Sequence, residues 1–496
     1  MGRAMRRAMR QHRTELDGFR DVAPGRPDRG RGPSDAPSSG PSGGPAGRSS
    51  GRGGAYPERG TAQGTGRGMP GLAVLFLLSL LPQISFWIGP LLLKPYRIVL
   101  LVLFVPLLVR LCSGAAGRMM AFDWLMIGAS LWATLALLTN HPASEVIEPG
   151  GVILIELLGA YLVARVCIRS AEDFRRVVKV LFAIILVLLV FAALESVTHR
   201  PILLQLLGQS QAISEASSRF GLRRAQAVFA HSIHYGVFVS AGLGMIWYAL
   251  RPDAGLIPRV VCTFVIGLST FFSLSTGALI TFIMQCGFII WEAVAKPHPK
   301  RWRLFAWGFL AGYILLDLVA TRTPFHVLVN YASFSSGSAY NRILIWRYGT
   351  DNVIANPIFG LGLNDWVKPG WMDESVDNFW LLLTMQYGLP FIAMFVGALY
   401  LILRRVSRQR LADPIDRACR AGYLTTFGGI VIAGGTVHYW QTMFAFVLFL
   451  FGTGVWIITG GAKQGPATAR PEDGHDPRGR RVDRRGEVSH RKRPIL

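Results

Sequence analysis

The chain has 496 residues, of which 51% are hydrophobic, and its formal net charge is +23. Polar residues gather at the two ends, so the apolar residues are concentrated between them, in more runs than a single secretory signal peptide explains. Five cysteines stand singly and no histidine pair has metal-ligand spacing, which argues against a disulfide framework and a zinc enzyme. We therefore expect a membrane protein with no metal and no cofactor.

The first segment, residues 1–69, is rich in arginine and glycine, and the last, 461–496, is also basic. Both are predicted to be disordered cytoplasmic tails. Arg/Gly-rich segments also occur in RNA-binding proteins. Because this one shows neither aromatic spacing nor a core, we expect a topology signal and no nucleic-acid partner. Met69 directly precedes the first apolar run, which leaves a start of the protein at Met69 open.

Residues 70–460 are predicted to form an all-α polytopic membrane domain with about 12 transmembrane helices. Apolar runs of about 20 residues recur there, long enough to cross a hydrocarbon layer of about 30 Å. The predicted spans are 70–88, 94–112, 121–139, 150–168, 176–195, 227–249, 258–274, 276–295, 303–320, 377–403, 421–438 and 440–459. A large loop, 321–376, separates the ninth span from the tenth.

Basic residues in the short loops fall on one side of the membrane if the spans alternate. These loops are 110–118, 165–179, 251–259, 296–303 and 404–420. The positive-inside rule then places them, and both termini, in the cytoplasm. The segment 196–226 and the loop 321–376 lie on the extracytoplasmic side, where we expect the active site.

Three arginines, Arg219, Arg223 and Arg224, precede the sixth span on the predicted outer face, against the bias that keeps positive charge inside. A guanidinium presents paired N–H donors that match phosphate oxygens, and it stays charged at any relevant pH. We interpret these residues as candidate ligands of a diphosphate, with contact to outer-leaflet headgroups as the alternative. Arg97 is a weaker candidate, because the second span enters from outside and places it about one turn below the surface.

His231 is predicted to lie about one turn into the sixth span, with His234 a turn beyond it. Residues three or four apart share a helix face, so Arg224, His231 and His234 would form one polar stripe. Such a stripe is costly in a membrane unless it faces protein or water. A histidine packed in the core is the alternative to a site residue.

The large loop contains an expected amphipathic surface helix with Arg342 and Trp346, which should end at Pro357. A turn on Gly360 and Gly362 follows, and such a turn can bring backbone N–H groups against a ligand. Asp377 and Asn378 then open the tenth span. Asp377 is a candidate general base, and a helix N-cap role for Asp377 or Ser375 fits equally well.

Five motifs follow in order along the chain. They are RAQAVFAHSIHYG (224–236), LSTGA (274–278), YNRILIW (340–346), NPIFGLG (356–362) and SVDNFWL (375–381). Their order and their placement on the predicted outer face resemble the O-antigen ligase and polymerase superfamily. The resemblance covers about 70–460.

That resemblance implies a metal-independent membrane glycosyltransferase of the GT-C type, acting on an undecaprenyl-diphosphate-linked glycan donor and a glycan acceptor at the periplasmic face of the inner membrane. Arg224 and Arg342 stand where the family binds the donor diphosphate. Asp377 or His231 would act on the acceptor hydroxyl. The residues expected to contact the glycan are Trp346, Trp366 and Asn378, although aromatic residues also gather at membrane interfaces. Membrane lipids, a chain-length regulator and export proteins are the further expected partners.

Two departures from the family pattern matter. Many relatives have Ser-Arg-Gly where this chain has Ser275-Thr276-Gly277, so one cationic contact is missing. Ligases that modify lipid A core typically have His-Asn where this chain has Asp377-Asn378, which favours a polymerase. The alternatives are an O-antigen ligase, a lipid-linked oligosaccharide flippase and a non-catalytic assembly protein. A flippase would be expected to show repeat symmetry and ionisable residues near the bilayer midplane.

Overall fold

The computed structural model describes residues 68–88, 91–209, 218–250, 252–319, 336–372 and 374–459. The predicted tails, 1–69 and 461–496, lie outside these ranges except for Gly68 and Met69. Residues 321–335 of the predicted large loop also lie outside them. All the described residues belong to one unit of the chain, Thr65–Leu496.

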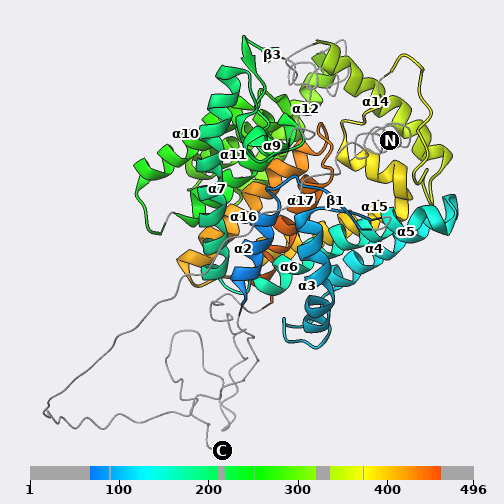
Figure 1. The fold of residues 1–496 in the computed structure, drawn as a ribbon. Helices are drawn as coiled ribbons and strands as arrows, with labels where there is room; N and C mark the ends of the chain where they lie inside the picture. Colours follow the sequence, from blue (N-terminus) through cyan, green and yellow to red (C-terminus); the bar gives the residue numbers. More distant parts are fainter. Residues whose placement is uncertain are drawn as a thin grey trace, which may run out of the picture. The chain divides into compact units, whose positions relative to one another are not determined.

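The described part of the chain is mainly helical, as predicted, and Figure 1 shows its arrangement. The helices are α2 (Pro70–Ser79), α3 (Pro95–Cys112), α4 (Ala121–Asn140), α5 (Ala143–Leu154), α6 (Ala160–Cys167), α7 (Ala171–Thr198), α8 (Ile202–Leu206), α9 (Ser232–Ala249), α10 (Leu256–Phe272), α11 (Thr276–Val294), α12 (Arg301–Val319), α14 (Ser336–Ala355), α15 (Phe379–Arg408), α16 (Pro414–Ala433) and α17 (Thr442–Gly452).

Short irregular and extended elements connect some of these helices. A π-helical turn, Ile155–Gly159, joins α5 to α6, and a 3-10 turn, Val455–Ile457, follows α17. Two antiparallel hairpins are formed by β1 (Phe86–Ile88) with β2 (Leu91–Leu93) and by β3 (Ser218–Arg219) with β4 (Leu222–Arg223). The sequence predicted no strand, because pairs of two or three residues carry too little pattern to be recognised.

Seven of the described helical segments are long and apolar enough to cross a membrane. They are Pro95–Cys112, Ala121–Asn140, Ala143–Cys167, Ala171–Thr198, Thr276–Val294, Arg301–Val319 and Phe379–Arg408. Shorter apolar helices occupy Pro70–Ser79, Leu256–Phe272 and Thr442–Ile457. The multi-spanning all-α class is therefore confirmed, whereas the count of twelve spans stays a prediction.

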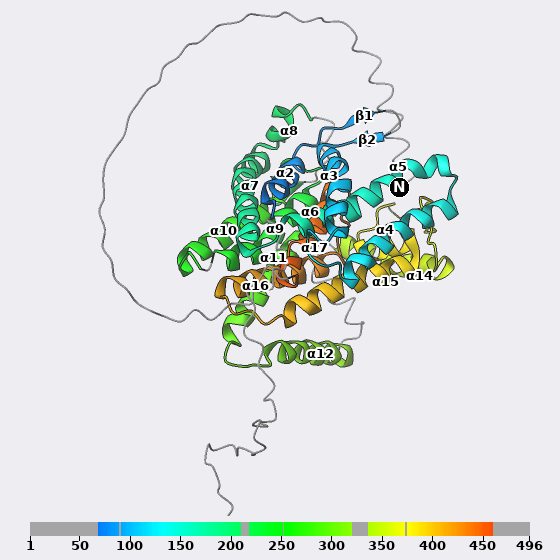
Figure 2. The same ribbon diagram turned by 90° about the horizontal axis from the view of Figure 1, so that it is seen from below.

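Helix α9 lies at the centre of one half of the bundle and packs against α10, α11 and α16 (Figure 1). Its close approach to α16 depends on two glycines. A β-carbon at Gly244 would lie 2.9 Å from the backbone nitrogen of Thr426, and one at Gly422 would lie 3.0 Å from the Gly244 carbonyl oxygen. Small residues allow helix backbones to pack this closely in membrane proteins. By contrast, α12 has no buried residue and lies at the edge of the bundle in Figure 2. Near its start, the ring centroid of Phe305 lies 5.5 Å from that of Trp291 of α11.

Helix α15 is broken at Gly388, whose φ of +81° is not helical. The segment 356–362 packs at this break, where the N–H of Leu361 donates to the carbonyl of Met385 at 2.7 Å. Gly360 adopts a φ of +64° to make the turn. The sequence allowed these backbone N–H groups to face a ligand, but Leu361 and its successor bond to α15 instead.

A buried ion pair joins α4 to α6. Arg165 and Asp123 are both fully buried, with Arg165 Nε 3.2 Å from Asp123 Oδ1. The hydroxyl of Tyr161 also donates to Asp123, and Arg165 Nη1 donates to the Ala116 carbonyl at 2.8 Å. The sequence placed Arg165 in a basic loop facing the cytoplasm. This part of the prediction is wrong, because the guanidinium is enclosed by the helices that it connects.

Candidate functional site

Several segments that are distant in the sequence meet at one end of the bundle, which we call the Asp377 end. The N–H of Phe379 donates to the Gly434 carbonyl at 2.8 Å, which ties the start of α15 to the α16–α17 loop. Arg219 Nη1 donates to the Leu274 carbonyl at 2.7 Å, which ties the β3–β4 hairpin to the α10–α11 connection. In Figure 1, β3 and α14 both lie at the top of the view.

Three arginines and one carboxylate at this end share one electrostatic environment. Burial lowers the pKa of Arg224 to about 10, the charge of Arg219 lowers it as well, and Asp377 acts in the opposite direction. Burial also lowers the pKa of Arg342, again with Asp377 opposing and Arg219 adding to the effect. The predicted pair, Arg224 and Arg342, therefore has the same two charged neighbours although the residues belong to separate segments.

The guanidinium of Arg224 is incompletely satisfied. Its Nε is buried and has no hydrogen-bond partner among the described residues. Burying a charged group without full compensation costs free energy, because water no longer solvates it. Asp377 acts on both Arg224 and Arg342, and Arg219 adds a further positive charge beside them, an arrangement that suits an anionic ligand.

Arg223 is held differently from its neighbours, by a glutamate that the sequence analysis did not single out. Glu195, at the end of α7, is 1% exposed, and its Oε1 lies 3.6 Å from Arg223 Nε. The same carboxylate accepts backbone N–H bonds from Gln226 at 3.3 Å and from Ala227 at 3.0 Å. This pairing fixes the loop before α9 and indicates an anchoring role for Arg223.

Backbone strain is concentrated at the Asp377 end. Five described non-glycine residues have a positive φ, and four of them lie here: Phe220, Ala227, Leu274 and Gln441, with φ of 55°, 51°, 46° and 51°. Each such residue costs on the order of 1–3 kcal/mol, and such residues cluster at active sites and ligand clamps. The strain is a second indication, independent of charge, that this end of the bundle is functional.

His231 precedes α9 rather than lying within it, so the predicted helical stripe with Arg224 is wrong. It is the N-cap residue, and its Nδ1 accepts the N–H of Ile233 at 3.1 Å. Burial and the charge of Arg224 lower the pKa of His231 to about 4, so the imidazole is neutral near pH 7. With Nδ1 as acceptor, the proton resides on Nε2, which makes that nitrogen a hydrogen-bond donor rather than a base.

The indole ring of Trp440 lies close to three histidine rings. The centroid of the Trp440 ring lies 3.7 Å from that of His234, 5.1 Å from that of His438 and 6.0 Å from that of His231. His234 is 2% exposed, and its Nε2 has no partner in the described part of the chain. Trp440 and His438 carry no signal in the sequence, because their proximity to His231 depends on how the α16–α17 loop folds.

The residues around the start of α15 have distinct positions. Asn378 caps the helix, with its Oδ1 accepting the N–H of Leu381 at 3.0 Å, so the expected cap role of Asp377 or Ser375 is wrong. The half-buried Asp377 side chain instead contributes its charge to Arg224 and Arg342. Asn378, expected to contact the glycan, is 6% exposed.

A helix, α14, occurs where the amphipathic surface helix was predicted and ends at Ala355, just before Pro357. Its position on a membrane surface stays a prediction. Leu344 and Ile345 of α14 form a small core with the following loop and α15. Trp366 belongs to this core and is 8% exposed, and its Nε1 donates to the Glu374 carbonyl at 3.3 Å. This environment is that of a packing residue rather than a sugar platform. Trp346 is 47% exposed, and its contact with a glycan stays a prediction.

Arg97 is already neutralised within the fold. Its Nε lies 2.7 Å from Glu156 Oε1, and its Nη1 donates to the Leu92 carbonyl at 2.9 Å. The neighbouring Lys94 was not noticed in the sequence. Its Nζ donates to Gln441 Oε1 at 2.6 Å, and burial together with the charge of Arg97 lowers its pKa to about 8, which Glu156 partly opposes. A buried lysine beside the strained Gln441 thus adds a cation near the α16–α17 loop.

Comparison with known proteins gives one distant similarity. The chain is 23% identical over 207 residues to a Rickettsia typhi protein named "Putative polysaccharide ligase". The matched region is 38% of this chain and 46% of that protein, so the chain spans less than half the length of this relative. No family model matches the chain. A match of this identity and extent does not by itself show the family of this chain.

Proposed function

We propose that this protein is a metal-independent membrane glycosyltransferase that polymerises undecaprenyl-diphosphate-linked oligosaccharide repeat units into exopolysaccharide or O-antigen. The single observation that carries the proposal is that Arg224 and Arg342, from separate segments, have the same two charged neighbours, Asp377 and Arg219. Guanidinium groups bind phosphate oxygens in paired, charge-assisted hydrogen bonds. A lipid diphosphate supplies the negative charge that the cluster lacks.

In the proposed reaction, an acceptor hydroxyl attacks the anomeric carbon of the donor glycan. The bond between that carbon and the diphosphate oxygen breaks, and the polyprenyl diphosphate leaves with the bonding electrons. Arg224 and Arg342 stabilise the charge that develops on this leaving group, with Arg219 as a third cation. Such preorganised charge in a partly dehydrated site often makes the largest contribution to catalysis.

The proton of the acceptor hydroxyl passes to Asp377, whose carboxylate lies in the field of both arginines. His231 is less suited to this role, because its Nδ1 already accepts the N–H of Ile233. Its Nε2–H serves better as a donor to a phosphate or glycan oxygen. Trp346, which is 47% exposed, is the proposed aromatic contact for a sugar.

The proposed setting is the periplasmic face of a bacterial inner membrane, with both termini in the cytoplasm. It rests on the loop charges of the sequence and the positive-inside rule. Donor glycan, acceptor glycan and membrane lipids are the proposed partners, together with a chain-length regulator and export proteins. A lipid-linked oligosaccharide flippase is less favoured, because the unusual charges gather at the Asp377 end rather than along the middle of the spans.

A second candidate function is ligation of a finished glycan to lipid A core. The observation that favours it is the name of the Rickettsia typhi relative, a polysaccharide ligase. Both reactions use the same donor and the same leaving group, so the arginine cluster serves either. The residues at positions 377 and 378, Asp-Asn rather than His-Asn, favour polymerisation.

The distinguishing experiment incubates the purified full-length chain with short lipid-linked repeat units, with and without a lipid A core acceptor. A ladder of products that requires no core acceptor supports the polymerase. Single transfer that requires the core acceptor supports the ligase. Movement of the donor across vesicles without any new glycosidic bond would contradict both and favour a flippase.

A further inference from the structure

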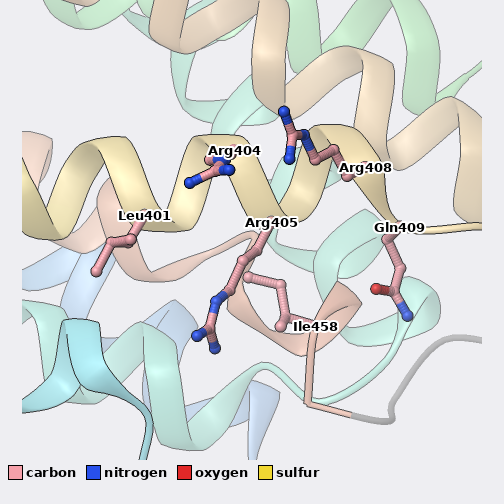
Figure 3. Close-up of a pocket in the computed structure, with 6 residues that line it drawn as sticks. All are labelled: Leu401, Arg404, Arg405, Arg408, Gln409 and Ile458. Carbon is pink, nitrogen blue, oxygen red and sulfur yellow. The ribbon is translucent and has the colours of Figure 1, made fainter.

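A pocket of about 350 Å³ lies at the last turn of α15, and the proposed glycosyl transfer does not use it. Figure 3 shows its lining residues, which are Leu401, Arg404, Arg405, Arg408, Gln409 and Ile458. Asp377 precedes the first residue of α15, so the whole 30-residue helix separates this pocket from the candidate active site. Its volume is within the range of cavities that bind small ligands.

The pocket carries three positive charges that nothing in the described ranges neutralises. Arg404, Arg405 and Arg408 fall within five successive residues, and none of them forms an ion pair with a described carboxylate. Arg404 and Arg408 are four residues apart on one helix face, where like charges repel. The C-terminal dipole of α15 favours cations but acts only over the last turn and is screened at the surface. The arginines therefore leave the pocket with unsatisfied positive charge.

Arg405 contacts two side chains that precede or begin α4, Met120 and Phe122. Its Nη1 lies 3.8 Å from the sulfur of Met120, and its guanidinium carbon lies 5.9 Å from the centroid of the Phe122 ring. Arg405 is half-buried, and Figure 3 shows its side chain extending from α15 on the same side as Ile458. A cation held over an aromatic ring and next to an apolar wall still has N–H groups available to an anion.

The remaining walls of the pocket fit a lipid. Leu401 and Ile458 supply apolar surface next to the three guanidiniums, and Leu401 lies one turn before them on a helix long enough to span the membrane. A phospholipid combines the same two properties, because its phosphate lies at the level of the helix ends and its chains lie along the spans. Basic pockets between membrane helices bind anionic headgroups in this way.

We propose that this pocket binds the phosphate group of an anionic phospholipid headgroup. The guanidiniums of Arg404, Arg405 and Arg408 bind the phosphate oxygens, and the amide of Gln409 offers a further donor. The first lipid chain segments pack against Leu401 and Ile458. The site is independent of the proposed glycosyl transfer, since it lies at the other end of α15.

The test uses native mass spectrometry of the purified full-length chain in a nonionic detergent, which presents no charged surface. Phosphatidylglycerol is titrated against the protein, with phosphatidylcholine as the zwitterionic comparison. The triple variant Arg404→Gln/Arg405→Gln/Arg408→Gln is compared with a control of equal charge change, Lys296→Gln/Lys300→Gln/Arg303→Gln. The control positions are exposed and lie outside the pocket. Thermal unfolding of each variant shows whether the fold is intact.

We expect the pocket variant to bind phosphatidylglycerol more weakly by about 100-fold, a factor of about five for each arginine near an anionic headgroup. The control variant should bind it like the unchanged chain. The proposal is overturned if the two variants lose affinity equally, or if phosphatidylcholine binds as tightly as phosphatidylglycerol. Competition by inorganic phosphate at equal strength would show that the pocket takes free phosphate and would overturn the lipid assignment. If the pocket variant unfolds, the corresponding Arg→Lys triple replaces it, and unchanged selectivity for phosphatidylglycerol is then the expected result.

Discussion

Arg165 is fully buried and Arg224 is half-buried, yet their charges are compensated in different ways. Arg165 has its own carboxylate, Asp123, and bonds to backbone carbonyls, so its charge is satisfied within the fold. Arg224 shares Asp377 with Arg342 and keeps an unbonded Nε within the described structure. The comparison indicates that burial alone does not identify a ligand-binding arginine. We propose that a buried charge with incomplete compensation is the better indicator.

The largest expected effect is on stability and concerns the buried ion pair of Arg165 with Asp123. Replacing Arg165 by Met leaves Asp123 buried without its cation, and breaking a buried ion pair in this way costs about 3–5 kcal/mol. We expect a corresponding fall in the free energy of unfolding, measured by denaturant titration in detergent. The double variant Asp123→Leu/Arg165→Met should recover much of that loss. A single variant as stable as the unchanged chain would contradict the assigned role.

The next effect is on the rate of glycan transfer and concerns Arg224 and Arg342. Arg224→Ala and Arg342→Ala should each lower the rate of glycan transfer by about 100-fold, which corresponds to about 3 kcal/mol of transition-state stabilisation. Neither should reduce stability as Arg165→Met does, because the carboxylate near both, Asp377, is half-buried, whereas Asp123 is fully buried. Arg200→Ala, an exposed position between α7 and α8, is the matched control and should keep full activity. Loss of stability in place of activity would make these arginines structural.

Lys94 gives a smaller effect that depends on pH. Burial lowers its pKa to about 8, so its charge is lost as pH rises through about 8. If that charge supports the site, the transfer rate should fall by up to about tenfold for each pH unit above this value. Stability should change in the opposite direction between about pH 8 and 10.5, because the unfolded chain there binds more protons than the folded one. In Lys94→Arg the decline in rate should disappear, and a persistent decline would assign it to another group.

The smallest effect separates a structural residue from a glycan-binding residue at the start of α15. Asn378→Ala removes the N-cap bond to Leu381 and should destabilise the protein by about 1 kcal/mol. Asn378→Asp keeps an acceptor and should restore stability. Thermal unfolding and the Michaelis constant for the acceptor are measured together. If Asn378→Ala raised the Michaelis constant and left stability unchanged, Asn378 would be a glycan-binding residue rather than a structural one.

The sequence predicted the helices well because long apolar runs have few other solutions in a membrane. It failed at boundaries where tertiary contacts decide. The apolar residues 227–230 extend the pattern of the sixth span, but Glu195 takes the N–H of Ala227, and α9 begins only at Ser232. In the sequence, the Trp366 position is typical of an aromatic residue at a membrane interface. In the structure, Trp366 is 8% exposed because it packs with residues of α14.

The pairing of charges was the least predictable part of the site. The grouping of Arg224 with Arg342 was expected from the family resemblance and from the violation of charge bias, and the two share charged neighbours in the structure. The partners of Arg97 and Arg165 were not expected, because Glu156 and Asp123 lie about 60 and 40 residues away and carry no local signal. Such pairs depend on which helices pack together.

The central claim is that Arg224 and Arg342 bind one diphosphate. A double-mutant cycle tests it most directly, with the affinity for a soluble short-chain polyprenyl diphosphate measured by calorimetry for the unchanged chain, Arg224→Ala, Arg342→Ala and the double variant. The account predicts that the double variant loses less binding energy than the sum of the single losses, with a coupling of at least about 1 kcal/mol. Strictly additive losses, or unchanged affinity in either single variant, would contradict it.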